Sequence, residues 1–236
     1  MPLHTHRVSF LLSYPMKESC IKFNYFLYFC YGITLSGLLL TAALVHKGDD
    51  VLWINGNHSL LLNGLFYSIT NLGDGLIFVP ITLVLLFVRF QYALVSATAG
   101  VLHGIICSVL KHQFFSATPR PAAVISHDLL YFIPGVDVHS HHSFPSGHTA
   151  TIFCAVFLLS LIFQHRLLSI SLLIIALLVG YSRIYLLQHF LIDVVGGALV
   201  GTITTFILWT VFEKNNRNWM SSRIELQVRQ PQVQQQ

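Results

Sequence analysis

The sequence predicts an all-α, polytopic membrane protein with six transmembrane helices. Of the 236 residues, 54% are hydrophobic and only 9% are charged, whereas a soluble domain carries about 25% charged residues. The mean hydropathy is +0.68, and the apolar residues gather in six runs, each near the roughly 17 to 25 residues that span a bilayer. These runs are 23–45, 74–90, 91–111, 148–164, 167–187 and 190–212.

The connections between the runs are short on one side and long on the other. Runs two and three meet at residues 88–91, and runs four and five meet at 164–166, which predicts two tight hairpins. On the other side, residues 46–73 are expected to form a short amphipathic helix in the membrane interface, and 112–147 form the longest polar connection. The expected domains are a cytoplasmic segment 1–22, a six-helix domain 23–212 and a polar, disordered tail 213–236.

The basic residues set the expected orientation, because cytoplasmic connections carry an excess of Lys and Arg. With the N-terminus inside, nine of the 13 basic residues lie on the cytoplasmic side, and none forms the run of like charges that favours nucleic-acid binding. We therefore expect both termini in the cytoplasm. The small size of the chain and its simple tails suit a bacterial inner membrane. The four basic residues left outside are Lys47, Lys111, Arg120 and Arg183.

Three of these outer cations lie where helices end at the extracytoplasmic surface. Helix parity places the ends of runs three and five beside the starts of runs four and six. Lys111, Arg120 and Arg183 therefore converge without nearby carboxylates, an arrangement that needs an anion. Guanidinium and ammonium groups bind phosphate oxygens by charge-assisted hydrogen bonds, so this cluster predicts a site for a phosphoryl group. Free N–H groups of Ser146 and Gly147, at the start of run four, favour the same anion.

Two histidines supply the expected chemistry at this surface. His189 and Asp193 are four residues apart on one helical face, so the carboxylate can hold one imidazole nitrogen while the other attacks phosphorus. His148 arrives from another helix and can protonate the departing alkoxide, then activate water. The set is complete without a metal or another cofactor. The expected partners are a phosphorylated lipid substrate and membrane lipids, with no nucleic acid.

The same residues form three motifs that resemble those of the type 2 phosphatidic acid phosphatase (PAP2) superfamily. Pro145-Ser146-Gly147-His148 is intact, and so is Ser182-Arg183-x5-His189-x3-Asp193. The first motif departs from the family pattern, because eight residues instead of six separate Lys111 from Arg120-Pro121. The resemblance covers residues 70–212. It implies a six-helix PAP2-type bundle, a phosphohistidine intermediate and no metal requirement. The residue roles that it implies are His189 as nucleophile, Asp193 as its orienting partner, His148 as general acid, and Lys111, Arg120, Ser146, Gly147 and Arg183 as phosphate ligands.

Several alternatives stay open at this stage. Single basic residues at helix ends commonly anchor a protein in the interface, and a six-helix transporter with a proton or anion relay is a second class of function. A phosphotransferase would use the same intermediate with another acceptor. The substrate is open among phosphatidic acid, phosphatidylglycerol phosphate, a polyprenyl pyrophosphate and a phosphorylated glycolipid. We interpret the His139–His142 cluster as a solvated loop that borders the site, in preference to a metal site. Gly196, Gly197 and Gly201 include a small-xxx-small pattern that serves close helix packing.

Overall fold

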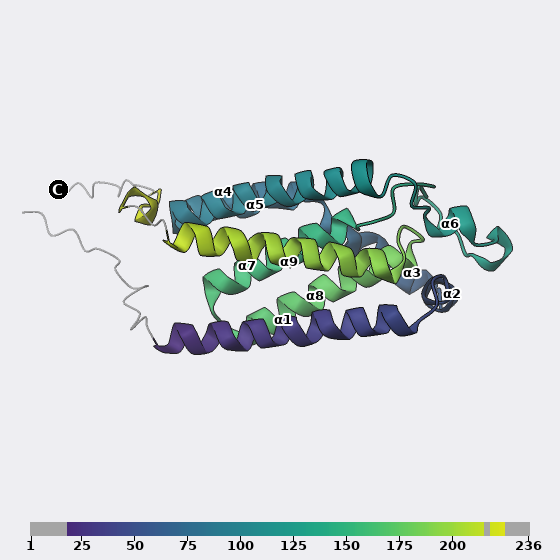
Figure 1. Cartoon of the computed structure of the whole chain (residues 1–236), viewed down its shortest axis with the longest axis horizontal. Coiled ribbons are helices and arrows are strands. Elements are labelled where there is room, and N and C mark those ends of the chain that lie inside the picture. Colours follow the sequence, from purple (N-terminus) through teal and green to yellow (C-terminus); the bar gives the residue numbers. More distant parts are fainter. Residues whose placement is uncertain (1–17, 215–217, 225–236) are drawn as a thin grey trace, which may run out of the picture.

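The computed structural model describes residues 18–214 and 218–224, which form helices and no strand (Figure 1). The α-helices are α1 Glu18–Leu44, α2 Asp49–Gly56, α3 Leu60–Ile69, α4 Phe78–Val88, α5 Phe90–Val109, α6 Pro121–Val124, α7 Gly147–Phe163, α8 Arg166–Tyr185 and α9 Leu191–Lys214. The shorter helical turns are η1 Thr70–Gly73, η2 Gly75–Ile77, the π turn η3 Leu110–Phe114, η4 His127–Leu129 and η5 Asn218–Ser221.

Among the described residues, four helical segments are long and apolar enough to cross a membrane. They are Lys22–Leu44, Phe90–Phe114, Arg166–Tyr185 and Leu191–Lys214. The segments Leu60–Gly73 and Gly75–Val88 meet at an angle of 58° and pass the same test together, as one bent span. The chain is therefore an all-helical membrane protein with four to five candidate spans.

One of the six expected spans is shorter than predicted, and a second, 148–164, forms a helix of the predicted 17 residues. In the run 74–90, the side chain of Asp74 accepts the N–H of Leu76 and begins a 3-10 turn, so α4 has only 11 residues. In the run 148–164, α7 has 17 residues because Gln164 takes a left-handed conformation at φ 50°. At 1.5 Å per residue, α7 is about 25 Å long, slightly less than the roughly 30 Å hydrocarbon core.

Helix α7 forms the centre of the bundle. It packs against α5, α8 and α9, and 12 of its 17 residues are buried. A helix that is apolar all round belongs in the interior, which explains this position. Because α7 begins at Gly147, the motif Pro145-Ser146-Gly147-His148 lies at the start of this central helix.

Two glycines allow α9 to cross α7 closely. A Cβ atom on Gly197 would lie 2.3 Å from the carbonyl oxygen of Ser146, and one on Gly201 would lie 2.2 Å from that of Ala150. No side chain fits at these distances, so the backbones of the two helices are in direct contact. The interpretation of this pattern as a packing face is confirmed.

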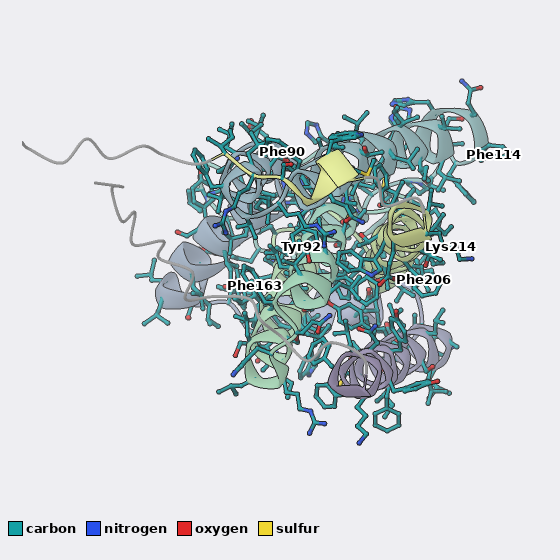
Figure 2. All side chains as sticks on the ribbon, turned by 90° about the vertical axis from the view of Figure 1, so that its left-hand side faces the viewer. Phe90, Tyr92, Phe114, Phe163, Phe206 and Lys214 are labelled. Atoms are coloured by element: carbon teal, nitrogen blue, oxygen red, sulfur yellow. The ribbon has the colours of Figure 1, made fainter. Side chains whose placement is uncertain are left out.

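The described ends of the chain lie at one end of the bundle, and α2, α3 and α6 lie at the other (Figure 1). Seen along its axis, the bundle has α1 on one side and the α4–α5 pair on the opposite side, near the label of Phe90 (Figure 2). Within the expected disordered tail, α9 continues to Lys214 and the carbonyl of Ser222 accepts the N–H of Phe90. Helix α1 begins at Glu18, inside the expected segment 1–22, and residues 1–17 lie outside the described part.

Candidate active site

The structure brings the predicted site residues together at the end of the bundle opposite the described termini (Figure 1). Lys111 lies in the π turn that follows α5, and Arg120 lies just before α6. His148 is in the first turn of α7, and Arg183 is in the last turn of α8. The loop between α8 and α9 carries His189. Four separate helix ends therefore meet at one site.

His189 is held by both its backbone and its side chain. Its N–H donates to the carbonyl of Arg183 at 3.1 Å, and only 2% of its surface is exposed. Its Nδ1 lies 3.5 Å from Oδ2 of Asp193, longer than a normal hydrogen bond. That oxygen already accepts the hydroxyl of Ser143 and the N–H of Phe190, which accounts for the long distance. Catalytic hydrogen bonds often shorten only when substrate binds.

The environment of His189 keeps its imidazole neutral. Burial lowers the pKa of His189 to about 3, and the positive charges of Arg183 and Arg120 act in the same direction, against the carboxylate of Asp193. A neutral imidazole has a free lone pair on one nitrogen. Because Nδ1 faces Asp193, Nε2 is the nitrogen available for attack on an electrophile.

Arg120 is fixed by neutral acceptors. Its Nε donates to the carbonyl of His141 at 2.9 Å, and its Nη1 donates to the carbonyl and the side-chain oxygen of Gln188 at 3.2 and 2.9 Å. Its own N–H donates to the carbonyl of Ser140. Burial lowers the pKa of Arg120, and Asp193 opposes that effect. Neutral acceptors orient the guanidinium without cancelling its charge, which stays available to an anion.

Arg183 carries an unused donor. Its Nη1 donates to the hydroxyl of Thr70 at 2.7 Å, but its Nε is buried and has no acceptor among the described residues. A buried donor without an acceptor costs about 1–3 kcal/mol. A phosphate oxygen would satisfy this N–H group.

Lys111 lies within electrostatic range of the other cations despite the longer first motif. It interacts with Arg120, Arg183 and Asp193, and the longer connection between Lys111 and Arg120 contains the end of the π turn. The carboxylate of Asp193 lies 3.5 Å from the neutral imidazole of His189. The three cations therefore outnumber the carboxylate that faces His189.

The start of α7 corrects the expected role of Ser146. Its N–H donates to the carbonyl of Asp193 at 2.9 Å, and its hydroxyl accepts the N–H and the hydroxyl of Thr149. These groups cap α7 and tie it to α9, so the N–H of Ser146 is not free for phosphate. In the described part of the chain, the N–H groups of Gly147 and His148 make no hydrogen bond and stay available.

His148 itself is half-buried and lies against η1. A Cβ atom on Gly73 would lie 2.8 Å from both the Cβ and the carbonyl oxygen of His148. His148 also interacts electrostatically with Arg183, Asp74, Lys111 and Arg120. It therefore lies among the same cations as His189, although it arrives from another helix.

Three buried side chains that hold the site were not identified from the sequence. Ser143 contacts Asp193, Gln188 holds Arg120, and Thr70 holds Arg183. Only Gln188 carried a signal, because a polar amide between Leu187 and His189 interrupts an apolar stretch. Ser143 and Thr70 lie in polar connections, where a buried residue cannot be told from a solvated one.

The His139–His142 cluster borders the site through its backbone. The carbonyls of Ser140 and His141 accept hydrogen bonds from Arg120, and the ring of His142 lies 4.7 Å from that of His112. Across residues 18–214 and 218–224, no group of three or more His, Cys, Asp or Glu side chains is arranged to hold a metal ion.

The comparison with known families gives the site its context. The sequence model of the PAP2 superfamily matches residues 90–217, more than half of the chain. The chain belongs to the PAP2 superfamily. A lipid A 4'-phosphatase of Porphyromonas gingivalis is 29% identical to this PAP2 protein over 180 residues, which cover 72% of this chain and 75% of that protein. An undecaprenyl-diphosphatase of Sulfolobus acidocaldarius is 28% identical over 155 residues, which cover 65% and 72%.

Two solved structures share the PAP2 fold. The crystal structure of Aquifex aeolicus LpxE matches with a TM-score of 0.63 and 29% identity, over 71% of this chain and 96% of that chain. A PAP2-type phosphatidylglycerolphosphate phosphatase from Bacillus subtilis matches in fold, with a TM-score of 0.54 and 21% identity, over 86% of this chain and 100% of that chain. The predictions of a PAP2 protein and of a membrane lipid phosphatase are confirmed.

Proposed function

We propose that this protein hydrolyses a phosphomonoester or pyrophosphate on a lipid head group, through a phosphohistidine formed on His189. One observation carries the proposal: a buried, neutral His189 backed by Asp193 lies among Lys111, Arg120 and Arg183. A neutral imidazole can attack phosphorus, and the cations attract the dianion that it must attack.

In the first step, Nε2 of His189 forms a bond to phosphorus as the bond from phosphorus to the lipid oxygen breaks. The bound phosphate dianion offsets the cations around His148, so that His148 is protonated and gives its proton to that oxygen, and the lipid leaves as an alcohol rather than an alkoxide. When the leaving group is a lipid phosphate, it accepts the same proton. Asp193 stabilises the positive charge that develops on His189.

In the second step, water hydrolyses the phosphohistidine. His148, now neutral, takes a proton from the water as the water oxygen attacks phosphorus. The bond from Nε2 to phosphorus breaks, inorganic phosphate leaves, and His189 returns to its neutral state. No atom or electron beyond water and the lipid phosphate is needed.

The remaining polar groups stabilise the transferring phosphoryl group. Arg183 offers its unused Nε, and Arg120 keeps its positive charge because only neutral acceptors hold it. The free N–H groups of Gly147 and His148 point from the positive end of α7. Lys111 adds a point charge. Such preorganised donors are aimed at charge that increases in the transition state.

The proposed membrane arrangement has six spans. Four are the long helices α1, α5, α8 and α9, and the other two are α7 and the bent α3–α4 segment. Helix α7 spans because α5, α8 and α9 surround it, and a slightly short helix in the bundle centre meets protein rather than lipid. The basic residues favour cytoplasmic termini. The site then faces the extracytoplasmic leaflet of a bacterial inner membrane.

Relatives that act on lipid A and on undecaprenyl diphosphate support a lipid with a terminal phosphate as the substrate. The test is release of inorganic phosphate by the purified protein from a panel of lipids, with a chelator present. The panel holds phosphatidic acid, phosphatidylglycerol phosphate, a polyprenyl diphosphate and a phosphorylated glycolipid. We expect turnover of at least one lipid that survives the chelator. Turnover that needs an added divalent metal would contradict the mechanism, and phosphate passed only to an added acceptor would make the protein a phosphotransferase.

A further inference from the structure

The fully buried residues of helix α1 lie in the first half of its length. Phe23, Leu27 and Tyr31 are buried there, and the ring of Tyr31 lies 4.6 Å from that of Phe157. The second half packs against the core only in part, and three side chains between residues 38 and 45 line a cavity of about 540 Å³. This cavity is called the α1 groove. Its volume lies within the roughly 300–1,000 Å³ of typical ligand sites.

The walls of the α1 groove adjoin the catalytic elements. Gly180 and Ile184 line it on either side of Arg183 along α8, and Leu191 and Val194 line it at the start of α9. The rest of the lining is mostly apolar and includes Trp53, Ile54, Phe153 and Leu177. Such a lining suits a hydrocarbon ligand.

The carboxylate of Asp50 lies at the edge of the α1 groove, where hydrogen bonds to both of its oxygens fix its position and leave its negative charge in place. Oδ1 accepts the N–H of Gly48 at 2.9 Å, and Oδ2 accepts the N–H of Leu191, the first residue of α9. Asp50 thus caps the helix that carries Asp193. Asp49 lies at the exposed rim.

A polar pocket continues the α1 groove. This second cavity, of about 230 Å³, shares Val45, Asp50 and Leu191 with the groove and is also lined by His46 and Lys47. The ammonium of Lys47 lies 4.6 Å from the ring centre of Phe190, the residue after His189, and it makes no ion pair within the described residues. An apolar groove that ends at an unpaired cation complements a lipid with an anionic head group.

We propose that a hydrocarbon chain of the lipid substrate lies in the α1 groove, with its anionic head group beside Lys47. This inference rests on the proposed function. The substrate is favoured over a resident bilayer lipid because the groove walls begin within three residues of Arg183 and Asp193. A chain held there keeps its phosphate close to the catalytic residues.

The test compares Thr41→Phe, which fills the groove, with Leu40→Phe, whose side chain is 60% exposed and outside the lining. KM and kcat are measured for phosphate release from a long-chain lipid phosphate and from its short-chain, water-soluble analogue. The ratio of the long-chain KM to the short-chain KM should rise about 3- to 10-fold in Thr41→Phe and stay at the wild-type value in Leu40→Phe. The effect is modest because the chain leaves lipid rather than water.

Three results would overturn the proposal. An unchanged KM ratio in Thr41→Phe excludes the substrate chain, and loss of a copurified phospholipid at an unchanged ratio assigns the groove to a bilayer lipid. The third result comes from a crosslinking experiment, in which the substrate analogue carries a photoreactive group at the end of its hydrocarbon chain. Crosslinks should map to residues 38–45 or 177–184 in the wild-type protein, and crosslinks confined to α4 and α5 would contradict the proposal. An active His189→Gln variant would instead refute the catalytic mechanism. Failure of the groove proposal and failure of the proposed function are therefore distinguishable.

Discussion

The N–H of Ser146 donates a hydrogen bond of 2.9 Å to the carbonyl oxygen of Asp193. This bond joins the start of α7 directly to the first turn of α9. It therefore links the residue before Gly147 and His148 to the backbone of Asp193, whose side chain faces His189. The two intact sequence motifs form one unit through their backbones, and Gly197 permits the close approach that the bond requires.

Replacement of Gly197 by alanine should separate these helices. The added methyl group would lie 2.3 Å from the carbonyl oxygen of Ser146, and overpacking of this kind costs about 1–3 kcal/mol. We expect a lower melting temperature in detergent and a lower kcat. The control is Gly104→Ala in α5, where nothing lies within 4 Å and alanine favours the helix. A Gly197→Ala variant as stable and active as Gly104→Ala would contradict the close crossing.

The arginine and the lysine of the cation cluster should differ in their tolerance of exchange. Arg183 uses Nη1 for Thr70 and keeps Nε for phosphate, and an ammonium cannot serve both at fixed positions. Arg183→Lys should lower kcat about 100-fold or more. Lys111 is proposed to act as a point charge, so Lys111→Arg should be more active than Lys111→Ala. Wild-type turnover in Lys111→Ala would remove Lys111 from the site.

The depressed pKa of His189 should appear in the pH dependence of stability. Unfolded histidine titrates near pH 6.5, whereas folded His189 stays neutral down to about pH 3, so the unfolded chain binds more protons between these values. Stability contributed by neutral His189 is therefore lost as the pH falls below about 6.5, by about 2 kcal/mol at pH 5. Unfolding midpoints at pH 7 and pH 5 should differ more in the wild type than in His189→Gln. Equal shifts in both proteins would show that His189 is protonated when folded.

The sequence predicted the helices and the location of the site for clear physical reasons. Apolar runs of bilayer length predict spans, and helix parity then brings Lys111, His148, Arg183 and His189 to one surface without any knowledge of packing. The glycines at 197 and 201 predicted a close helix contact because small residues recur four apart. These features depend on periodicity and composition, which a single sequence shows directly.

Features that depend on tertiary hydrogen bonds could not be predicted. The bond from Ser146 to Asp193 joins residues 47 positions apart, and no local pattern shows that this N–H is used. The same holds for Ser143, which contacts Asp193 from a polar loop. The length of α4 depended on the local backbone conformation at Asp74, because hydropathy does not record where a helical turn changes type.

The role of His148 should depend on the leaving group. If His148 protonates the departing oxygen, His148→Ala should slow phosphate release from an alkyl phosphate by about 10²- to 10⁴-fold. The loss should be much smaller with an activated phenolic phosphate, because a phenolate departs without a proton. Turnover of both substrates by the wild type and the variant measures this difference. An equal loss with both substrates would assign His148 a role in binding instead.

The most direct test of the mechanism is capture of the phosphoenzyme. The purified protein is mixed with lipid substrate carrying labelled phosphate and is quenched in alkali, because phosphohistidine is labile in acid. The wild type and a control, His112→Gln, should carry label that acid removes, and peptide mapping should place it on His189. His189→Gln should carry no label and show no turnover, because no other nitrogen in the site is placed to attack. A labelled His189→Gln protein, or label mapped to another residue of the wild type, would contradict the mechanism.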